Sequence, residues 1–193
     1  MKHYIGVDGG GSKTAVLVID ENQQPLGRGL AGASNHLRVG IETATRNIER
    51  AVNIALVEAG IAIRNVDYAY CGIAGADHPA HHQRVVDALR IFFPGGNFIV
   101  DTDARIALTG AVGFGSGIVV ISGTGSVAFG RNESGDEARS GGWGPTIGDE
   151  GSGYAIARDG LSAIVRAHDG RGKKTKMTEM LCYDYDMCSP EDL

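Results

Sequence analysis

A glycine-rich stretch near the N-terminus, Asp8-Gly-Gly-Gly-Ser-Lys-Thr14, sets a carboxylate, two hydroxyls and a cation beside bare backbone amides. Glycines leave N–H groups open to an anion, and a lysine at the same rim binds phosphate oxygens. A carboxylate there can hold the water shell of magnesium. The stretch therefore predicts a site for a polyphosphate with its magnesium ion.

Two well-known phosphate-binding motifs are excluded for this stretch. A Walker A loop needs Gly-Lys-[Ser/Thr] followed by a helix, whereas here the apolar run 15–19 follows and predicts a strand. The dinucleotide fingerprint would need its third glycine where Thr14 stands. An ordinary glycine-rich hairpin stays open as an alternative for this stretch taken alone.

A second turn of the same kind, Ser122-Gly-Thr-Gly-Ser126, lies between the apolar runs 118–121 and 127–130. It repeats the first hairpin in outline, as a strand, a turn of glycines and hydroxyls, and a returning strand. The glycines between positions 110 and 117 form the boundary that we expect between two domains, 1–116 and 117–193. Two such turns, one opening each unit, favour two lobes that hold one polyphosphate.

The elements that must position these turns follow from the periodicity of apolar residues. We expect strands near 4–8, 15–20, 26–30, 66–73, 98–100, 118–121 and 127–130. We expect one helix over 41–59, a second that starts at Asp77 and Pro79 and stops at 94–96, a short third helix that runs through Leu108, and a fourth over 154–167. Three strands, then helix, strand, helix and strand, indicate a mixed α/β fold with a parallel crossover.

Composition excludes several classes of partner. The net charge of −5 and the pI of 5.6 give no support for nucleic-acid binding. No run approaches the roughly 20 apolar residues of a membrane span, and no signal peptide is visible. The cysteines Cys71, Cys182 and Cys188 are odd in number and lack a ligand-type spacing, which favours reduced thiols in the cytoplasm.

Five ordered motifs resemble one protein family over essentially all 193 residues. To the two glycine turns are added Ser34-Asn-His36, Thr102-Asp-Ala104 and the pair Gly141-Gly-Trp-Gly144 with Gly148-Asp-Glu-Gly-Ser152. Together they resemble the N-acetylglucosamine kinases among the BadF-type ATPases, in the actin, hexokinase and heat-shock-chaperone superfamily. The resemblance implies a ribonuclease-H-like lobe followed by the start of a second similar lobe.

The resemblance also implies cofactors and roles. The cofactors would be ATP and Mg²⁺, and the reaction the transfer of the γ-phosphate to the 6-hydroxyl of N-acetylglucosamine or a related amino sugar. Asp8 would hold magnesium through water, and Asp103 would accept the proton of the sugar hydroxyl. The phosphates would be bound by Gly10, Gly11, Ser12, Lys13, Gly123, Thr124 and Gly125. The sugar would be bound by Asn35, Asp103, Gly125, Ser126, Trp143, Gly144 and Asp149.

Elementary chemistry supports Asp103 independently of that resemblance. Phosphoryl transfer depends on positioning, charge neutralisation and one carboxylate that orients the hydroxyl. Asp103 follows a strand end, where α/β sheets place their ligands. A helix N-cap is the structural alternative for Asp103, and Asp101 is the substitute candidate for the base.

Two further groups of side chains can be assigned from their surroundings in the sequence. His78, His81 and His82 are expected to lie exposed at a helix start instead of binding a metal. Trp143 lies among glycines, so a pocket wall is favoured over the core.

Other functions remain open at this stage. The kinase could act on glucosamine or a muramic-type sugar. It could instead be an activator of 2-hydroxyacyl-CoA dehydratases, although the cysteines match the iron–sulfur cluster of such a protein poorly. A non-catalytic ATP-dependent sensor or an inactive fragment is the non-enzyme alternative. The expected partner is a small amino sugar, with no nucleic acid or membrane, and a homodimer is possible.

The tail, Ser189-Pro-Glu-Asp192, reads as a helix start with a serine cap and a proline in the first turn. In the family that the chain resembles, the second lobe is at least as large as the first and carries adenosine-binding glycines that nothing here matches. We therefore expect these 193 residues alone to turn over little or no ATP.

Overall fold

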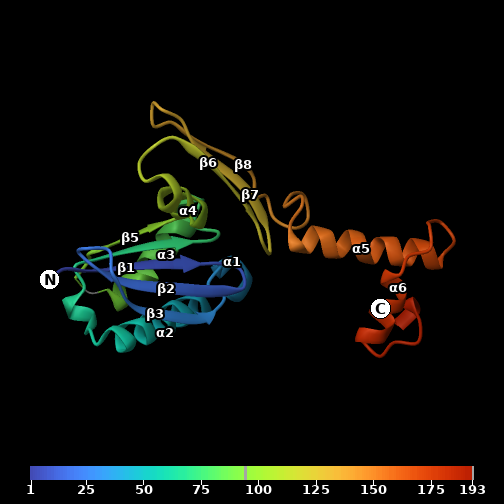
Figure 1. Ribbon diagram of the computed structural model, residues 1–193, viewed down its shortest axis with the longest axis horizontal. Coiled ribbons are helices and arrows are strands. Elements are labelled where there is room, and N and C mark those ends of the chain that lie inside the picture. Colours follow the sequence, from blue (N-terminus) through green and yellow to red (C-terminus); the bar gives the residue numbers. More distant parts are fainter. Residues whose placement is uncertain (94, 193) are drawn as a thin grey trace. The chain divides into compact units, whose positions relative to one another are not determined.

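The computed structural model describes every residue except Pro94 and Leu193 (Figure 1). The chain forms two compact units. The first comprises Met1–Val120 with Ala128–Ser140, and the second comprises Ile121–Val127 with Gly141–Leu193.

A five-stranded sheet organises the first unit. Its strands are β1 (His3–Gly9), β2 (Lys13–Asp20), β3 (Pro25–Gly32), β4 (Tyr68–Ile73) and β5 (Phe98–Asp101). They lie in the order β3-β2-β1-β4-β5. β2 pairs antiparallel with β1 and β3, and β4 pairs parallel with β1 and β5. The predicted mixed α/β arrangement, including the parallel crossover, is confirmed.

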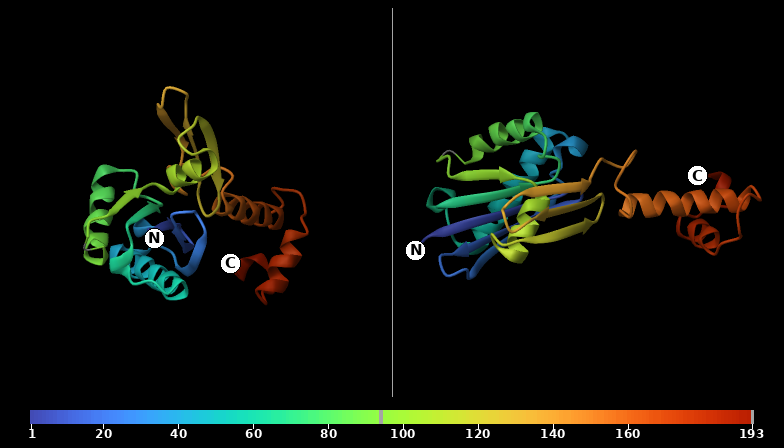
Figure 2. Two further views of the ribbon diagram at one scale, coloured as in Figure 1. Left: turned by 60° about the vertical axis from the view of Figure 1, so that its left-hand side comes forward. Right: turned by 90° about the horizontal axis from the view of Figure 1, so that it is seen from above.

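The helices α2 (Ile41–Ala59) and α3 (Pro79–Phe92) cover one face of this sheet (Figure 2). Inward side chains of alternate strand residues meet the apolar stripes of both helices in one core. β3 has no side chain at Gly29, where a Cβ would collide with the backbone of Ala51, so α2 lies close against this strand. α2 ends as predicted at Gly60, which has a φ of +69°.

The helix α4 (Asp103–Val112) packs on the opposite face of the sheet, with Ile106 against the bare Cα of Gly72. The oxygen Oγ1 of Thr102 caps this helix by accepting from the amide of Arg105 at 3.2 Å. α4 continues through Gly110 to Val112, so the predicted helix, which ended near Leu108, was too short. The glycine run at 110–117, the predicted domain boundary, therefore begins inside this helix.

Two helix starts differ from expectation. α3 is capped by His78, whose Nδ1 accepts from the amide of Ala80 at 3.3 Å, and Asp77 pairs with Arg139 instead of capping. The predicted stop of this helix includes Pro94, which lies outside the described residues. A short helix, α1 (His36–Val39), was not predicted, and Asn35 caps it.

A second sheet contains β6 (Gly117–Ser122), β7 (Ser126–Arg131) and β8 (Glu137–Gly141), in that order. The hairpin of β6 and β7 was predicted, and β8 was not. Of the last helices, α5 (Gly153–His168) is confirmed and α6 (Met177–Asp184) was missed. The predicted helix start in the tail is a single 3₁₀ turn, Pro190–Asp192. Over the described residues, the helices are too short or too polar to cross a bilayer.

Candidate active site

Two carboxylates, Asp8 and Asp103, lie at the edge where the parallel strands end. Asp8 pairs in register with Gly72 of β4, and Gly72 pairs with Asp101 of β5. Side chains alternate along a strand, so Asp8 points away from the core formed with α2 and toward the face on which α4 packs. Asp103 begins α4 directly after β5. The strand ends thus bring both carboxylates to one place.

The environment of Asp103 favours its protonated form. Burial raises the pKa of its carboxyl above the ordinary value of 3.8, and the negative charge of Asp8 raises this pKa further. A hydrogen bond that the amide of Ala104 donates to Oδ1 at 2.9 Å acts in the opposite direction. Asp103 is therefore a stronger base than an exposed aspartate.

Asp101, the substitute candidate, is occupied by structural contacts. Nη1 of Arg105 lies 3.0 and 3.1 Å from its two carboxylate oxygens, and the hydroxyl of Tyr70 donates to it at 3.1 Å. Burial and this carboxylate raise the pKa of Tyr70 to about 12, so the phenol stays a donor. The side chain of Thr102, and not that of Asp103, caps α4. A role as helix cap therefore does not account for an aspartate at position 103. Of the two aspartates, Asp103 is the one without an ion pair in the described part of the chain.

The first glycine turn is joined to the loop that carries Asn35. The carbonyl of Gly10 accepts from the amides of Ser34 and Asn35 at 3.0 and 3.1 Å. Nη1 of Arg38 donates to the carbonyl of Gly11 at 3.3 Å. Ser12 and Lys13 are exposed at the rim of the turn. The predicted phosphate turn and the predicted sugar loop are therefore neighbours in the first unit.

Asn35 has a structural task that the sequence did not reveal. Its Oδ1 accepts from the amide of Leu37 at 3.1 Å and caps α1. An asparagine side chain also carries two N–H donors on its nitrogen, which this bond does not use. Asn35 can therefore hold its loop in place and still donate to a ligand hydroxyl.

In the second unit, the second glycine turn is held by the segment that follows Trp143. The hydroxyl of Ser122 donates to the carbonyl of Gly151, and the hydroxyl of Ser126 donates to that of Glu150, both at 2.8 Å. The turn itself closes through the amide of Gly123 and the carbonyl of Gly125 at 2.9 Å. Two serines that flank the glycines thus fix the turn from either side.

Asp149 contacts two other predicted sugar residues, Gly125 and Gly144. It is buried and has a φ of +58°, a left-handed backbone that side chains rarely adopt. Its Oδ1 accepts from the amide of Gly144 at 3.3 Å, and a Cβ on Gly125 would lie 2.7 Å from its Oδ2. The second unit therefore brings Gly125, Gly144 and Asp149 together, beside Trp143. Trp143 is 68% exposed, outside the core as expected, and Thr124 is also exposed.

The predicted residues thus fall into two groups, one in each unit. The first unit holds Asp8, Asp103, Asn35 and the turn at 10–13. The second unit holds the turn at 123–126 with Trp143, Gly144 and Asp149.

Of the three histidines, His78 is exposed at the helix start as expected, and the other two differ from expectation. His81 and His82 are half-buried instead of exposed, and His82 Nε2 lies 3.0 Å from the carbonyl of Val100. The ring of His81 lies 5.3 Å from that of His36 and 5.4 Å from that of His78. Burial, followed by the charges of His81 and Arg84, lowers the pKa of His36. Within the described residues, no group of three acidic, histidine or cysteine side chains could hold a metal ion.

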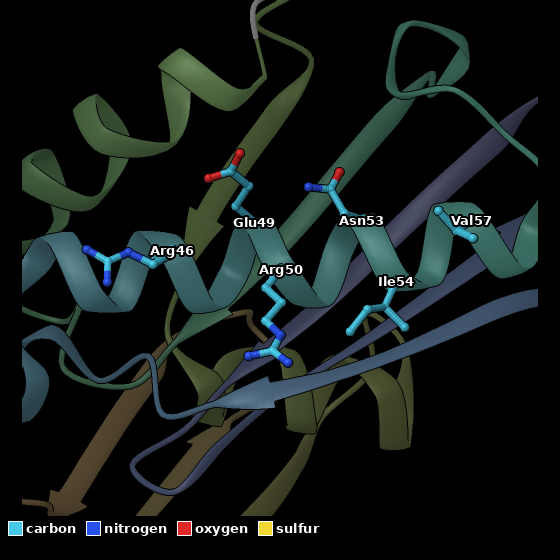
Figure 3. A pocket seen from close by; sticks show the side chains of 6 residues that line it. All are labelled: Arg46, Glu49, Arg50, Asn53, Ile54 and Val57. Atoms are coloured by element: carbon cyan, nitrogen blue, oxygen red, sulfur yellow. The ribbon is translucent and has the colours of Figure 1, made fainter.

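A surface hollow of the first unit lies on the outer side of α2. The side chains that line it all come from this helix (Figure 3): Arg46, Glu49, Arg50, Asn53, Ile54 and Val57. It is shallow and distant in sequence from both carboxylates, and it contains none of the predicted site residues.

Comparisons with known proteins agree with the motifs. Residues 5–188 match the model of the BadF/BadG/BcrA/BcrD ATPase family. The chain is 38% identical over its whole length to an N-acetylmuramic acid/N-acetylglucosamine kinase of Clostridium acetobutylicum, covering 63% of that protein. It is 34% identical to the N-acetyl-D-glucosamine kinase of Dictyostelium discoideum, over 98% of the chain and 62% of that protein.

A solved structure shows the same fold. A proposed N-acetylglucosamine kinase from Chromobacterium violaceum superposes with a TM-score of 0.79 at 26% identity, over 95% of this chain and 64% of that one. The fold is therefore that of the actin-like ATPases. The chain spans less than two thirds of the length of each of these three relatives.

Proposed function

Because the chain belongs to the BadF/BadG/BcrA/BcrD ATPase family, we propose that the intact protein is an ATP-dependent amino-sugar kinase. It transfers the γ-phosphate to the 6-hydroxyl of N-acetylglucosamine or a closely related sugar. The observation that carries this proposal is Asp103, a half-buried carboxylate without an ion pair in the described chain, beside Asp8 at the strand ends. The kinases named among its relatives support the choice of an amino sugar.

In this proposal Asp103 is the proton acceptor. The sugar hydroxyl donates a hydrogen bond to the Asp103 carboxylate, and its oxygen forms the bond to the γ-phosphorus. The bond from that phosphorus to the bridging oxygen breaks, and the hydroxyl proton passes to Asp103. The raised pKa of Asp103 suits this role, because a more basic carboxylate takes the proton more readily.

The exposed carboxylate of Asp8 suits a hydrated magnesium ion, a hard cation that prefers oxygen ligands and keeps much of its water. Magnesium, when bound, would neutralise part of the charge on the polyphosphate. Gly10, Gly11, Ser12 and Lys13 would donate to phosphate oxygens from the first turn. Gly123, Thr124 and Gly125 have the same proposed role in the second turn.

For the sugar, we assign Asn35 of the first unit as a donor to a hydroxyl group. Its loop is fixed by two hydrogen bonds to Gly10, which supports a preformed contact. In the second unit, the proposed sugar contacts are Gly125, Ser126, Trp143, Gly144 and Asp149, several of which the structure brings together.

A muramic-type sugar is the second candidate substrate, because the printed name of the Clostridium relative includes N-acetylmuramic acid. Glucosamine is a third, since a glucosamine kinase of Vibrio cholerae is 27% identical to this chain. Activation of a 2-hydroxyacyl-CoA dehydratase is disfavoured. Burial raises the pKa of the Cys71 thiol to about 12, so this cysteine is not prepared to ligate a cluster as a thiolate.

The test is sugar-dependent release of ADP by the intact protein across a panel of sugars. We expect N-acetylglucosamine or N-acetylmuramic acid to give the highest kcat/KM, and glucose a much lower one. Phosphorus coupling in the product spectrum identifies the phosphorylated hydroxyl. ADP release at the same rate without any sugar would contradict the proposal and favour an ATPase of another kind. That residues 1–193 alone turn over little ATP stays a prediction, tested in the same assay.

A further inference from the structure

Two hydroxyls that no proposed catalytic step uses are completely buried behind the first glycine turn. Thr14 and Ser34 each have 0% of their surface exposed, and their oxygens lie 2.8 Å apart. Oγ1 of Thr14 also donates to the carbonyl of Gly32 at 2.7 Å. A hydroxyl has a single proton, so Ser34 is left to donate to Thr14. The result is a hydrogen-bonded chain from Ser34 through Thr14 to the main chain of β3.

This pair joins two segments that the proposed function assigns to different substrates. Thr14 follows the residues of the phosphate turn directly, at the start of β2. Ser34 precedes Asn35, and both of their amides donate to the carbonyl of Gly10. The carbonyl of Ala33 accepts from Nδ2 of Asn47 at 2.7 Å, which fixes the other side of the loop to α2. Movement of the phosphate turn must therefore disturb the loop of Asn35.

The packing around the pair leaves little space for either segment to shift alone. A Cβ on Gly9 would lie 2.5 Å from Oγ of Ser34 and 2.6 Å from Cδ1 of Ile73. Ile73 is itself fully buried. The glycine, the serine and the isoleucine thus lie in close contact behind the turn, with no space for an added methyl group.

We propose that Thr14 and Ser34 are positioning residues that couple the phosphate turn to the sugar loop. Because the two segments move together, binding of phosphate at the turn changes the position of the loop that presents Asn35, and binding of sugar at the loop changes that of the turn. This inference rests on the proposed function for the identity of the two ligands. The coupling is reciprocal, since each ligand must affect the affinity for the other by the same factor.

The first experiment needs no ligand. Amide hydrogen exchange is compared between the parent protein and Thr14→Val, which keeps the shape of the side chain and removes the hydroxyl. We expect exchange over residues 33–39 to accelerate by about five-fold or more relative to β4, because Ser34 loses its buried partner. Thr14→Ser, which keeps the hydroxyl, should restore protection.

Thr45→Val is the matched control, because Thr45 also donates a half-buried hydroxyl to a main-chain carbonyl, that of Ile41 at 2.8 Å. It should leave the exchange of residues 33–39 unchanged relative to β4. If Thr14→Val accelerates the loop no more than β4, or no more than Thr45→Val does, the inference is overturned.

The second experiment measures the coupling itself by calorimetric titration of the intact protein with N-acetylglucosamine. The titration is repeated in the presence of magnesium and a non-hydrolysable ATP analogue. The analogue should lower the sugar Kd several-fold in the parent protein, in Thr14→Ser and in Thr45→Val, and much less in Thr14→Val. Equal lowering in Thr14→Val, or none in the parent protein, contradicts the coupling. A parent protein that binds no sugar under either condition contradicts the proposed function, and the exchange experiment then decides the structural coupling by itself.

Discussion

The two glycine turns are alike in sequence but differ in what supports them. Behind the first, β1 and β2 belong to a sheet that α2 and α3 cover, and strand residues such as Val7 and Val16 are buried. The second turn follows β6, where Ile118 and Val120 are 79% and 72% exposed. Its shape is held mainly by hydroxyls of Ser122 and Ser126 on main-chain carbonyls.

The difference indicates that two turns of similar sequence can differ in rigidity, because the structure around each turn differs. In the first unit, tight packing and a buried hydroxyl pair determine the shape of the turn. Among the described residues of the second unit, Ala155 and Ile164 are the apolar residues with buried side chains. Since burial of apolar surface supplies most of the stability of a fold, the second unit should be the more mobile of the two when residues 1–193 are studied alone.

The largest expected difference is in amide hydrogen exchange. Amides of β1 and β4 should exchange slower than those of α5 and α6 by a factor on the order of 10³ or more, because only the former open with the whole core. Both sets are measured in one sample of residues 1–193, so conditions are shared. Protection of α5 equal to that of β4 would contradict the comparison.

A smaller effect is expected from adding one methyl group to each turn. Gly9→Ala should lower the free energy of unfolding by about 1–3 kcal/mol, because its Cβ has no space beside Ser34 and Ile73. At Gly123, a Cβ meets no atom within 4 Å, and Gly123→Ala should change stability by less than about 0.5 kcal/mol. Urea unfolding compares the two variants. Equal costs would show that both turns are equally packed.

Asn35 tests whether the rigid loop of the first unit contacts the sugar. Asn35→Asp keeps an oxygen that can cap α1 and removes the N–H donors, whereas Asn35→Ala removes both. Both variants should raise the sugar KM by about ten-fold or more, because a lost hydrogen bond costs about 1–3 kcal/mol, and change the ATP KM little. If Asn35→Asp behaves like the parent protein, Asn35 only caps the helix.

The smallest effect concerns the pH dependence of stability. The pKa of Asp103 is raised, so its ionised form is disfavoured in the folded state. That destabilisation is absent below the ordinary value of 3.8, grows as pH rises through the folded-state pKa, and is complete above it. Asp103→Asn should therefore be more stable than the parent protein at neutral pH, with the gain disappearing toward pH 3.8.

Asp8→Asn serves as the companion variant, because the charge of Asp8 is the smaller of the two causes that raise the pKa of Asp103. It should give a smaller gain in the same pH range. Thermal unfolding between pH 4 and neutral pH measures both. A gain from Asp103→Asn that grows as the pH falls would contradict the assignment of a raised pKa.

Elements with a long apolar pattern could be predicted from the sequence. α2 was found with its end at Gly60 because its buried residues recur every three or four positions. α1 has four residues and depends on the cap by Asn35, so no periodicity could reveal it. β8 is exposed at four of its five positions, which removes the alternation that identifies a strand.

The same reasoning explains what was foreseen of the site. Asp103 could be predicted as a site residue because it follows a strand end, where α/β sheets place their ligands. The pairing of Thr14 with Ser34 depends on the register of β2 and β3 and on the path of the following loop, neither of which a local pattern contains. The ion pair of Asp101 with Arg105 was missed, although its spacing of four residues on a helix start was a usable signal.

The most direct test of the account compares Asp103→Asn with Asp101→Asn in the intact protein, using the sugar-dependent release of ADP. We predict that Asp103→Asn lowers kcat by on the order of 10²-fold or more, while sugar and ATP still bind. Asp101→Asn should act mainly on stability, through the loss of its contacts with Arg105 and Tyr70. A kcat for Asp103→Asn within a few-fold of the parent value, with a large loss in Asp101→Asn, would contradict the assignment of Asp103 as the base.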